Sequence, residues 1–471
     1  MSIEPFHGAR VFQSGNDPVF VSYVSTSTVG LLVAVDPDDL PEGVSLNTPI
    51  LIQNVTDAAE LPAEAREEID TVFDQVATNV VLVMTDEGAS PTELMANAVG
   101  NSSTLTGVHA WLKATSLGLP KPKLLAAPDL TRAGAADGIV SVAVTTPGTG
   151  YDETTTVTVA GTTGQGAVLR AVIGGGGAIS SIVVETPGFG YGGTLTVTIT
   201  GAGTGAAATA AKGAVLNPVI AEALGVTEKL RAQFYADGPD GTDQQAVAAR
   251  AKIGDKRVCY SDPRVLKSIA GVPVPKSSST VFAALQAKQD RERNVAWPAS
   301  NILINGIQGV NRPIDDGLQA TYLNENGVNT IINRGDGFRA WGPMTCAVGT
   351  IWRFVSVVRV ADLVNESIEA AFVQFNDRPQ SRMNIDLMVM AGREALRGLE
   401  SEGVLLPGSE FGLASSQGPA DGVQGIVKFA MKYEPPAPIY DIRIAAYRNT
   451  TIAYELLYDS VSGKVDVGDL I

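Results

Sequence analysis

Short apolar runs alternate with segments of helical spacing through the first 260 residues, and this alternation constrains the fold of the chain most. An uninterrupted run such as Val29–Val35 is typical of a strand that is buried on both faces. In Pro62–Val76, by contrast, the apolar residues recur at helical spacing. Strands and helices in this order predict an α/β fold that is doubly wound, with a mainly parallel sheet and helices on both faces. The expected strands are 29–35, 80–84, 123–127, 232–235 and 257–260, and the expected helices are 62–76, one opening at Pro91, 218–224, 243–252 and 281–292.

A duplication interrupts the alternation. Gly138–Tyr151 matches Ala178–Tyr191, so that 178 − 138 gives a period of 40 residues. Each unit contains a strand, a Pro-Gly-x-Gly-Tyr turn, a second strand and a glycine-rich return, and glycine supplies the positive φ angles of such turns. The duplication begins where the strand 123–127 should lead into the helix 218–224. We therefore predict an inserted all-β module of two repeats, residues 138–212, on an outward-facing loop of the α/β domain.

The pattern changes beyond residue 345. We expect a strand at Ile351–Val360, helices at Asp362–Phe375 and Ser381–Leu399, and a strand at Ile426–Lys432. Alternating residues then predict two late strands, at 440–446 and 452–458, while residues 1–20 are polar and irregular and precede a short alternating run at 19–24. The predicted organisation is an N-terminal arm (1–20), an α/β domain (21–137 and 213–345), the β insert (138–212), a C-terminal α+β domain (346–450) and a C-terminal arm (451–471).

The overall charge argues against several kinds of partner. The chain has 34 basic and 50 acidic residues, a net charge of -16, which disfavours binding to nucleic acid or to an anionic membrane. No apolar run approaches the roughly twenty residues that span a bilayer. The first residues do not form a secretory signal, so we expect the protein to be made in the cytoplasm.

Residues suited to catalysis or metal binding are scarce. Cys259 and Cys346 lie in apolar segments and are expected to be buried, reduced thiols, and the two histidines, His7 and His109, have no ligand or triad pattern around them. The string Gly188–Gly193 fits a dinucleotide fingerprint, but β-rich sequence follows it, so we interpret it as a β-turn. The acidic run that begins at Asp36 is interpreted as a solvated loop, since Pro41 stands where a calcium loop needs glycine. We expect no catalytic residue, no metal and no cofactor.

A set of motifs in residues 287–345 points to a family. A Pro-Ala-x-Asn segment precedes a short apolar strand and an Asn-Gly-Ile turn, and a Leu-Asn-x-x-Gly-Val strand later leads to Gly-x-Arg-x-Trp-Gly. The residues are Pro298, Ala299, Asn301, Asn305, Gly306, Ile307, Leu323, Asn324, Gly327, Val328, Gly337, Arg339, Trp341 and Gly342. This stretch resembles the tail sheath proteins of contractile-tailed bacteriophages and the related R-type bacteriocins, although Pro follows Gly342 where many relatives have Asn. The likeness extends over most of 20–137 and 214–471 and leaves the insert 138–212 outside.

The resemblance implies a structural subunit that polymerises helically around an inner tail tube and contracts to drive the tube through the host envelope. Its partners would be further copies of itself, the inner tail tube protein, and the baseplate and tail terminator proteins, with no nucleic acid and no membrane insertion. It would be assembled in the host cytoplasm and reside in the virion tail.

The resemblance also implies a role for the terminal arms. In the family, arms from two neighbouring subunits complete the C-terminal domain of a third, which keeps the lattice connected during contraction. The positions that correspond to such arms are Val19, Val21, Val24, Ile452, Tyr454, Leu456 and Tyr458.

Two other functions stay open at this point. An α/β hydrolase-like enzyme with a β insertion would need convergent polar residues at strand ends. A virion surface binding protein would instead use the repeats, for example as a weak glycan-binding surface formed by Tyr151, Phe189 and Tyr191, for which packing in the turns is the competing interpretation.

Overall fold

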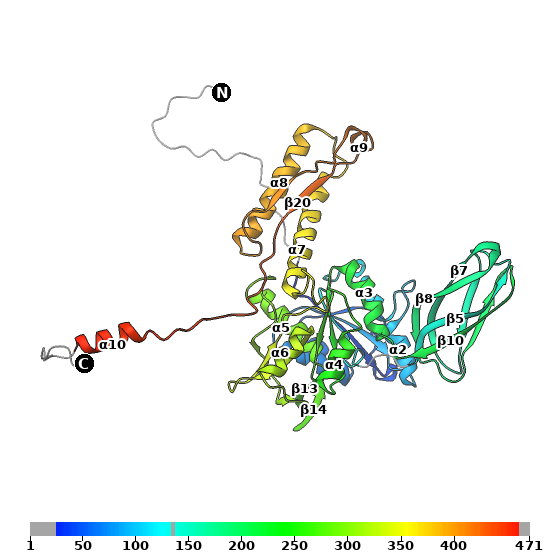
Figure 1. Cartoon of the computed structure of the whole chain (residues 1–471), viewed down its shortest axis with the longest axis horizontal. Helices are drawn as coiled ribbons and strands as arrows, with labels where there is room; N and C mark the ends of the chain where they lie inside the picture. Colours follow the sequence, from blue (N-terminus) through cyan, green and yellow to red (C-terminus); the bar gives the residue numbers. More distant parts are fainter. Residues whose placement is uncertain (1–24, 133–136, 461–471) are drawn as a thin grey trace, which may run out of the picture. The chain divides into compact units, whose positions relative to one another are not determined.

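The computed structural model describes residues 25–132 and 137–460. They belong to two compact units, one that ends at Ala437 and one that begins at Pro438. The first unit contains a large sheet with its helices, the β insert and a group of C-terminal helices, and the second contains the helix α10 (Thr450–Asp459) (Figure 1).

A nine-stranded sheet lies at the centre of the first unit, in the order β15-β18-β17-β12-β11-β4-β1-β3-β2. Its six middle strands run parallel, and antiparallel pairs complete both edges. The parallel strands are β1 (Val29–Val35), β3 (Val80–Asp86), β4 (Leu124–Ala126), β11 (Gln233–Asp237), β12 (Val258–Ser261) and β17 (Val328–Asn333). The edge strands are β2 (Ile50–Ile52), β18 (Phe338–Trp341) and β15 (Ile302–Leu303). The five strands that we expected in the first 260 residues of the α/β domain therefore all lie in one sheet.

Successive residues of the middle strands enter two separate cores. Leu31 lies in a core with α1 (Ala63–Phe73) and α5 (Ser278–Glu292), whereas Leu32 lies in a core with α3 (Pro218–Leu230). A strand that is buried on both faces is apolar at every position, which explains the uninterrupted runs in the sequence. The second core also includes residues of α2 (Pro91–Val99), α4 (Asp243–Arg250) and α6 (Leu318–Glu325). A small sheet that we did not predict, β14-β13-β16, is formed by β13 (Val265–Ile269), β14 (Val272–Lys276) and β16 (Gly309–Val310).

The insert lies between β4 and α3 and has its own apolar core. Its strands are β5 (Gly138–Thr149), β6 (Thr156–Ala160), β7 (Gln165–Ile173), β8 (Ile179–Phe189), β9 (Thr196–Thr200) and β10 (Thr204–Gly213). They form a four-stranded sheet, β8-β7-β6-β9, and a two-stranded sheet, β10-β5. The first strand of one repeat pairs with the last strand of the other, and the middle strands β6 and β9 pair with each other. The two repeats are thus interlocked.

The tyrosines of the two turns hold the repeats together. The Tyr151 hydroxyl accepts a hydrogen bond from the backbone N–H of Ala206 at 3.2 Å, and the Tyr191 hydroxyl accepts one from Ala167 at 3.1 Å. In each case the tyrosine of one repeat holds the return strand of the other. Tyr151 and Tyr191 are buried, which confirms packing in the turns for these two aromatics.

The two turns differ at the residue between their glycines. Phe189 is buried and packs with Val215 against Met95 and Val99 of α2, whereas the equivalent Thr149 is exposed. Only one of the two turns therefore docks on the sheet domain, and the larger apolar residue is found there. Phe189 is likewise unavailable as a sugar platform.

The C-terminal helices of the first unit pack on a two-stranded sheet. The elements are α7 (Val355–Phe372), α8 (Arg382–Ser401), β19 (Glu410–Leu413), the short helix α9 (Pro419–Val423) and β20 (Phe429–Lys432). Phe372, Phe411 and Phe429 form a cluster of aromatic rings, with centroids 5.4 to 5.6 Å apart. The structure confirms the helix predicted at Ser381–Leu399 as α8, and α7 includes most of the helix predicted at Asp362–Phe375.

The strand predicted at Ile351–Val360 is wrong, because α7 begins at Val355. The run is rich in β-branched valine, which favours strands locally. Residues 355–364 are all buried, so apolar side chains occur on every side of the helix and hide its periodicity.

The late strands are also wrong. No strand is assigned in 440–446, and residues 452–458 lie in α10, where Ile452, Tyr454, Leu456 and Tyr458 are all more than half exposed. The Asn449 side chain accepts from the backbone N–H of Ile452 and caps the helix, and Tyr454 stacks on Tyr458 one turn later. The alternation of apolar and polar residues is too short here to distinguish a strand from a helix.

The tyrosine bonds can be tested by Tyr191→Phe. The change leaves the partly buried N–H of Ala167 without its acceptor, which should destabilise the insert by about 0.5–1.5 kcal/mol. Hydrogen exchange of the full chain should show faster exchange at the Ala167 amide. The control is Tyr447→Phe, at a tyrosine that is 90% exposed, and equal exchange in both variants would contradict the role of the Tyr191 bond.

Candidate assembly interface

One face of α7 joins the C-terminal helices to the sheet domain through charge pairs. Positions 359, 362, 366 and 369 recur at helical spacing, and each pairs with a different segment at or near the amino ends of the parallel strands. The pairs are Arg359–Asp290, Asp362–Arg257, Glu366–Lys121 and Lys123, and Glu369–Arg231. We call these four positions the α7 charge stripe.

The inner end of the stripe is buried. The side chains of Arg359 and Asp290 are 5% and 0% exposed, and Arg359 Nη1 lies 2.6 Å from Asp290 Oδ1. Burial disfavours the charged guanidinium, but Asp290 outweighs this effect and the pKa of Arg359 is raised. Burial lowers the pKa of Lys123 to about 8, and Glu366 opposes the shift. Charges this deeply placed depend on their partners.

The small sheet beyond α7 has free edges. Among the described residues, β19 and β20 pair only with each other, as in Phe411 opposite Met431. Each strand therefore keeps one row of backbone N–H and C=O groups without a ladder partner, which is the usual template for addition of a strand from another chain. On α8, Met383, Leu387 and Met390 are exposed along one line of the helix.

The motif residues of 298–342 stabilise the far edge of the large sheet. Asn301 is in the left-handed region, and its backbone carbonyl accepts from Arg339 Nη1 at 3.1 Å. Asn329, just after the Gly-Val pair at 327–328, bonds to both the N–H and the C=O of Met344. Gly342 has φ +125°, and a Cβ there would lie 2.6 Å from Asn329 Oδ1. The motif therefore specifies backbone geometry at β15, β17 and β18.

The same region matches known proteins. A family model described as the phage tail sheath protein central domain matches residues 199–346. A putative prophage major tail sheath protein of Pseudomonas aeruginosa (strain UCBPP-PA14) is 31% identical over 229 residues, covering 47% of this chain and 59% of the relative. This part of the chain is thus similar to phage tail sheath proteins.

Other sheath proteins extend the likeness. The tail sheath protein of Burkholderia phage BcepMu is 30% identical over 243 residues, covering 47% of this chain and 51% of its own length. The chain thus spans between half and three fifths of the length of these two sheath relatives. The tail sheath protein of Escherichia phage P2 is 22% identical over 423 residues, covering 85% of this chain and 84% of its own.

The sheath fold is also found among solved structures. The helical sheath of the anti-feeding prophage in its contracted state matches with a TM-score of 0.58 at 16% identity, covering 95% of this chain and 100% of that one. The contracted sheath complex of an extracellular contractile injection system matches with a TM-score of 0.58 at 15% identity, covering 96% and 99%. These matches show a shared fold of mixed sheet and helices.

The arm positions inferred from the family fall into two groups. Val19, Val21 and Val24 lie outside the described residues. Ile452, Tyr454, Leu456 and Tyr458 lie together on α10 of the second unit. The α7 charge stripe was not identified from the sequence, although the helical spacing of Asp362, Glu366 and Glu369 could have indicated it.

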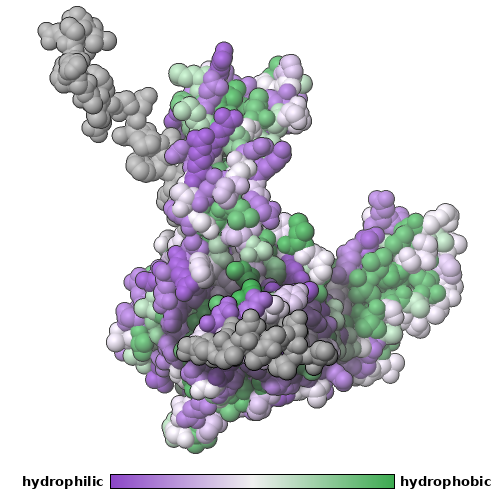
Figure 2. All heavy atoms as spheres, turned by 60° about the vertical axis from the view of Figure 1, so that its left-hand side comes forward, coloured by the Kyte–Doolittle hydropathy of each residue, from purple (hydrophilic) through white to green (hydrophobic). Residues whose placement is uncertain are grey.

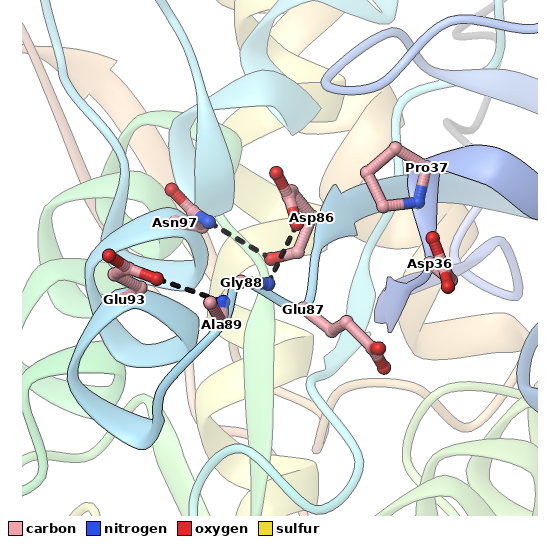
Figure 3. Close-up of a pocket in the computed structure, with 8 residues that line it drawn as sticks. All are labelled: Asp36, Pro37, Asp86, Glu87, Gly88, Ala89, Glu93 and Asn97. Carbon is pink, nitrogen blue, oxygen red and sulfur yellow. Dashed lines mark hydrogen bonds between the residues drawn. The ribbon is translucent and has the colours of Figure 1, made fainter.

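A pocket lies at the carboxyl ends of β1 and β3 (Figure 3). Its ionisable lining residues are all acidic, namely Asp36, Asp86, Glu87 and Glu93. The Asp86 carboxylate accepts from the N–H of Gly88 at 2.7 Å, Glu93 accepts from Ala89 at 2.8 Å, and Asp36 caps the short helix at Pro37–Asp39. These carboxylates stabilise loops, in agreement with a solvated loop at Asp36.

The remaining reactive side chains have structural surroundings. Cys259 and Cys346 are free and buried, as expected, and burial raises the pKa of Cys259 to about 12. His109 is buried with Nε2 3.4 Å from Glu222, and Gly188–Gly193 spans the end of β8 and the turn that follows it. Among the described residues, no group of three or more His, Cys, Asp or Glu is placed to hold a metal, and no helix is long and apolar enough to cross a membrane.

The surface of the insert is partly apolar. Figure 2 shows hydrophobic residues over the insert, and Val140, Val168 and Val183 are each at least 38% exposed. Scattered apolar residues of this kind are ordinary on a folded surface.

The buried pair can be tested by Asp290→Ala. Removal of the carboxylate leaves Arg359 buried and unpaired, which should destabilise the first unit by about 3–5 kcal/mol in chemical denaturation. Asp386→Ala removes the exposed pair with Arg382, whose side chains are 66% and 96% exposed, and should change stability by less than about 0.5 kcal/mol. Equal effects in the two variants would contradict the assignment.

Glu68 predicts a pH dependence of stability. Burial raises its pKa from 4.5 to about 7, and the Thr280 hydroxyl, which donates to it, opposes the shift. The folded state therefore keeps a proton that the unfolded state loses, so stability falls as the pH rises from about 4.5 through about 7. Burial also raises the pKa of Asp237, which acts in the same direction.

Glu68→Gln should remove its part of this dependence, up to about 3 kcal/mol between pH 5 and 8 in urea unfolding. The neighbour Glu67, paired with Lys276 at the surface, supplies the control Glu67→Gln, which should retain the wild-type slope. An unchanged slope in Glu68→Gln would show that Glu68 does not titrate in this range.

Proposed function

We propose that this chain is the structural subunit of a contractile tail sheath, whose copies polymerise helically around an inner tail tube and contract to drive the tube through the host envelope. The observation that carries the proposal is the likeness of residues 199–346 to the sheath central domain. The fold match to contracted sheaths over nearly the whole chain supports it.

The free edges of β19 and β20 offer the means of assembly. A strand from a neighbouring copy can pair with each edge, and each main-chain hydrogen bond contributes about 0.5–1.5 kcal/mol. Residues 19–24, with Val19, Val21 and Val24, are one such arm. Residues 438–449 supply the extended part of the other, since they carry no assigned helix or strand before Thr450 and expose Ile439, Ile442 and Ile444. On α10, Ile452 and Leu456 lie on one side and Tyr454 and Tyr458 on the other, and these exposed apolar side chains then contact the neighbouring copy.

The further partners are the inner tail tube, the baseplate and the tail terminator, and the location is the virion tail. The role needs no enzymatic activity and no cofactor. The free energy of contraction comes from burial of more subunit interface in the contracted lattice. Heterologous contacts that do not close into a ring generate helical filaments, which agrees with linked arms.

We propose the same organisation for the chain as the sequence suggested. A doubly wound α/β domain covers 21–137 and 213–345, an α+β domain follows from 346, and terminal arms cover 1–20 and 451–471, with the C-terminal arm now beginning at Pro438, where the second unit begins. The insert 138–212 decorates the tail without a part in polymerisation, and its interlocked repeats with their own core support this role.

Deletion of residues 1–24, which removes Val19, Val21 and Val24, tests the arm. The truncated chain should fold with an unchanged melting temperature but remain monomeric, since the arm is absent and the cores are complete. Negative-stain electron microscopy and light scattering at high concentration, with an inner tube added, would follow tube formation. Normal tubes from this variant would remove the arm from the assembly mechanism.

Deletion of 138–212, joined across the adjacent ends of the insert, is the matched control. It removes more residues but should still give striated tubes. Failure of that variant to form tubes while it remains folded would contradict the decorative role of the insert.

A further inference from the structure

In the segment that leads from the N-terminal arm into β1, three successive carbonyl groups accept hydrogen bonds from other parts of the first unit. The carbonyl of Thr26 accepts from Arg359 Nη2 at 3.0 Å, and that of Ser27 accepts from the Thr78 hydroxyl at 2.8 Å. The carbonyl of Thr28 accepts from the backbone N–H of Lys123 at 2.9 Å. The three donors come from α7, the approach to β3 and the approach to β4. We call residues 25–28 the arm root.

Arg359 is suited to this contact because of its planar guanidinium group. Two of its nitrogens face the two carboxylate oxygens of Asp290, and Nη2 also donates to Thr26. The paired carboxylate fixes the plane of the guanidinium and thereby the direction of the third bond. A lysine at 359 would keep the positive charge but could not pair two nitrogens with the two carboxylate oxygens of Asp290.

The arm root is also linked to the α7 charge stripe at a second point. Lys123, whose backbone holds Thr28, directs its ammonium group to Glu366 of α7. Thr28 itself is buried, while Ser25 is exposed. The change from exposed to buried chain therefore occurs where α7 meets the sheet domain.

We infer that Arg359, oriented by Asp290, is a positioning residue that fixes the direction in which the N-terminal arm leaves the subunit. The inference rests on the proposed function, in which that arm joins a neighbouring copy. An arm whose root is fixed loses less conformational entropy when its partner strand pairs. Arg359 thus favours assembly without touching the neighbouring copy.

The test measures the arm root directly, in the full chain and before assembly. Spin labels on Ser25→Cys and Ala370→Cys, both at exposed positions, report the distance between the arm root and the outer half of α7. Cys259 and Cys346 are buried and free, so their labelling is checked in the parent chain. The variants are Arg359→Lys and Thr78→Val, which weaken the root at two different carbonyls. The control is Arg257→Lys. Arg257 pairs with Asp362 of the α7 charge stripe but donates no hydrogen bond to the arm root.

Loss of the charge-assisted hydrogen bond from Arg359 should raise the detached population of the root about tenfold, and loss of the neutral bond from Thr78 should raise it about fivefold. The distance distribution should therefore be narrow in the parent and in Arg257→Lys, and broader in Arg359→Lys and Thr78→Val, measured at a temperature where every variant is folded. A narrow distribution in both root variants would overturn the inference. If Arg359→Lys does not fold, Thr78→Val decides alone.

Tube formation is scored separately. A broad distance distribution together with fewer tubes supports both the anchor, by which we mean the fixing of the arm root by Arg359, and the role of the arm in assembly. Broad distances with normal tubes leave the anchor in place and contradict the proposed use of the arm. Narrow distances with few tubes overturn the anchor while leaving the proposed function untouched.

Discussion

The structure depends on charges that are buried where α7 meets the amino ends of the parallel strands. Such pairs contribute little net stability compared with apolar residues of the same size, but each partner is costly to leave alone. Their value lies in specificity. A shift of α7 by one helical turn would separate Arg359 from Asp290 and misplace Asp362, Glu366 and Glu369 together. The α7 charge stripe therefore fixes one orientation for the helices and the small sheet that follow.

The apolar contacts of the molecule specify its arrangement less strictly than the charge pairs do. The two cores of the large sheet accept any residue of suitable volume, and the aromatic cluster of Phe372, Phe411 and Phe429 similarly holds α7 to β19 and β20 without direction. In the insert, the directional element is again polar, namely the exchanged hydrogen bonds of Tyr151 and Tyr191. Packing makes these regions stable, and a few polar contacts make each arrangement unique.

The sequence predicted best where local pattern and tertiary burial agree. The run at Val29–Val35 is apolar at each position because both faces of β1 are covered, and the Pro-Gly-x-Gly-Tyr turns are visible because glycine is needed at positive φ. The sequence-based prediction was wrong at Val355–Val360, because a helix that is buried on all sides shows no helical period in its apolar residues. It was also wrong at 452–458, where a short alternation of apolar and polar residues is typical of a strand but the chain forms a helix.

The candidate interface was harder to predict than the fold. The family motif was recognisable because Asn301, Gly327 and Gly342 are required by backbone geometry. The partners of Arg359 were not, because Asp290 and Thr26 are distant in sequence and only the fold brings them together. The free edges of β19 and β20 likewise follow from the absence of a third strand in the described chain, which no local pattern encodes.

The insert has a topological consequence for the protein that carries it. Gly138 and Gly213 are register partners at the ends of β5 and β10, so the chain enters and leaves the module at one place. For the sheet domain the module is therefore a side branch between β4 and α3. Such a junction accepts any domain whose termini lie close together. The position between β4 and α3 is therefore a natural graft site, at which a lineage or an engineer can exchange one appended domain for another while the parent fold stays intact.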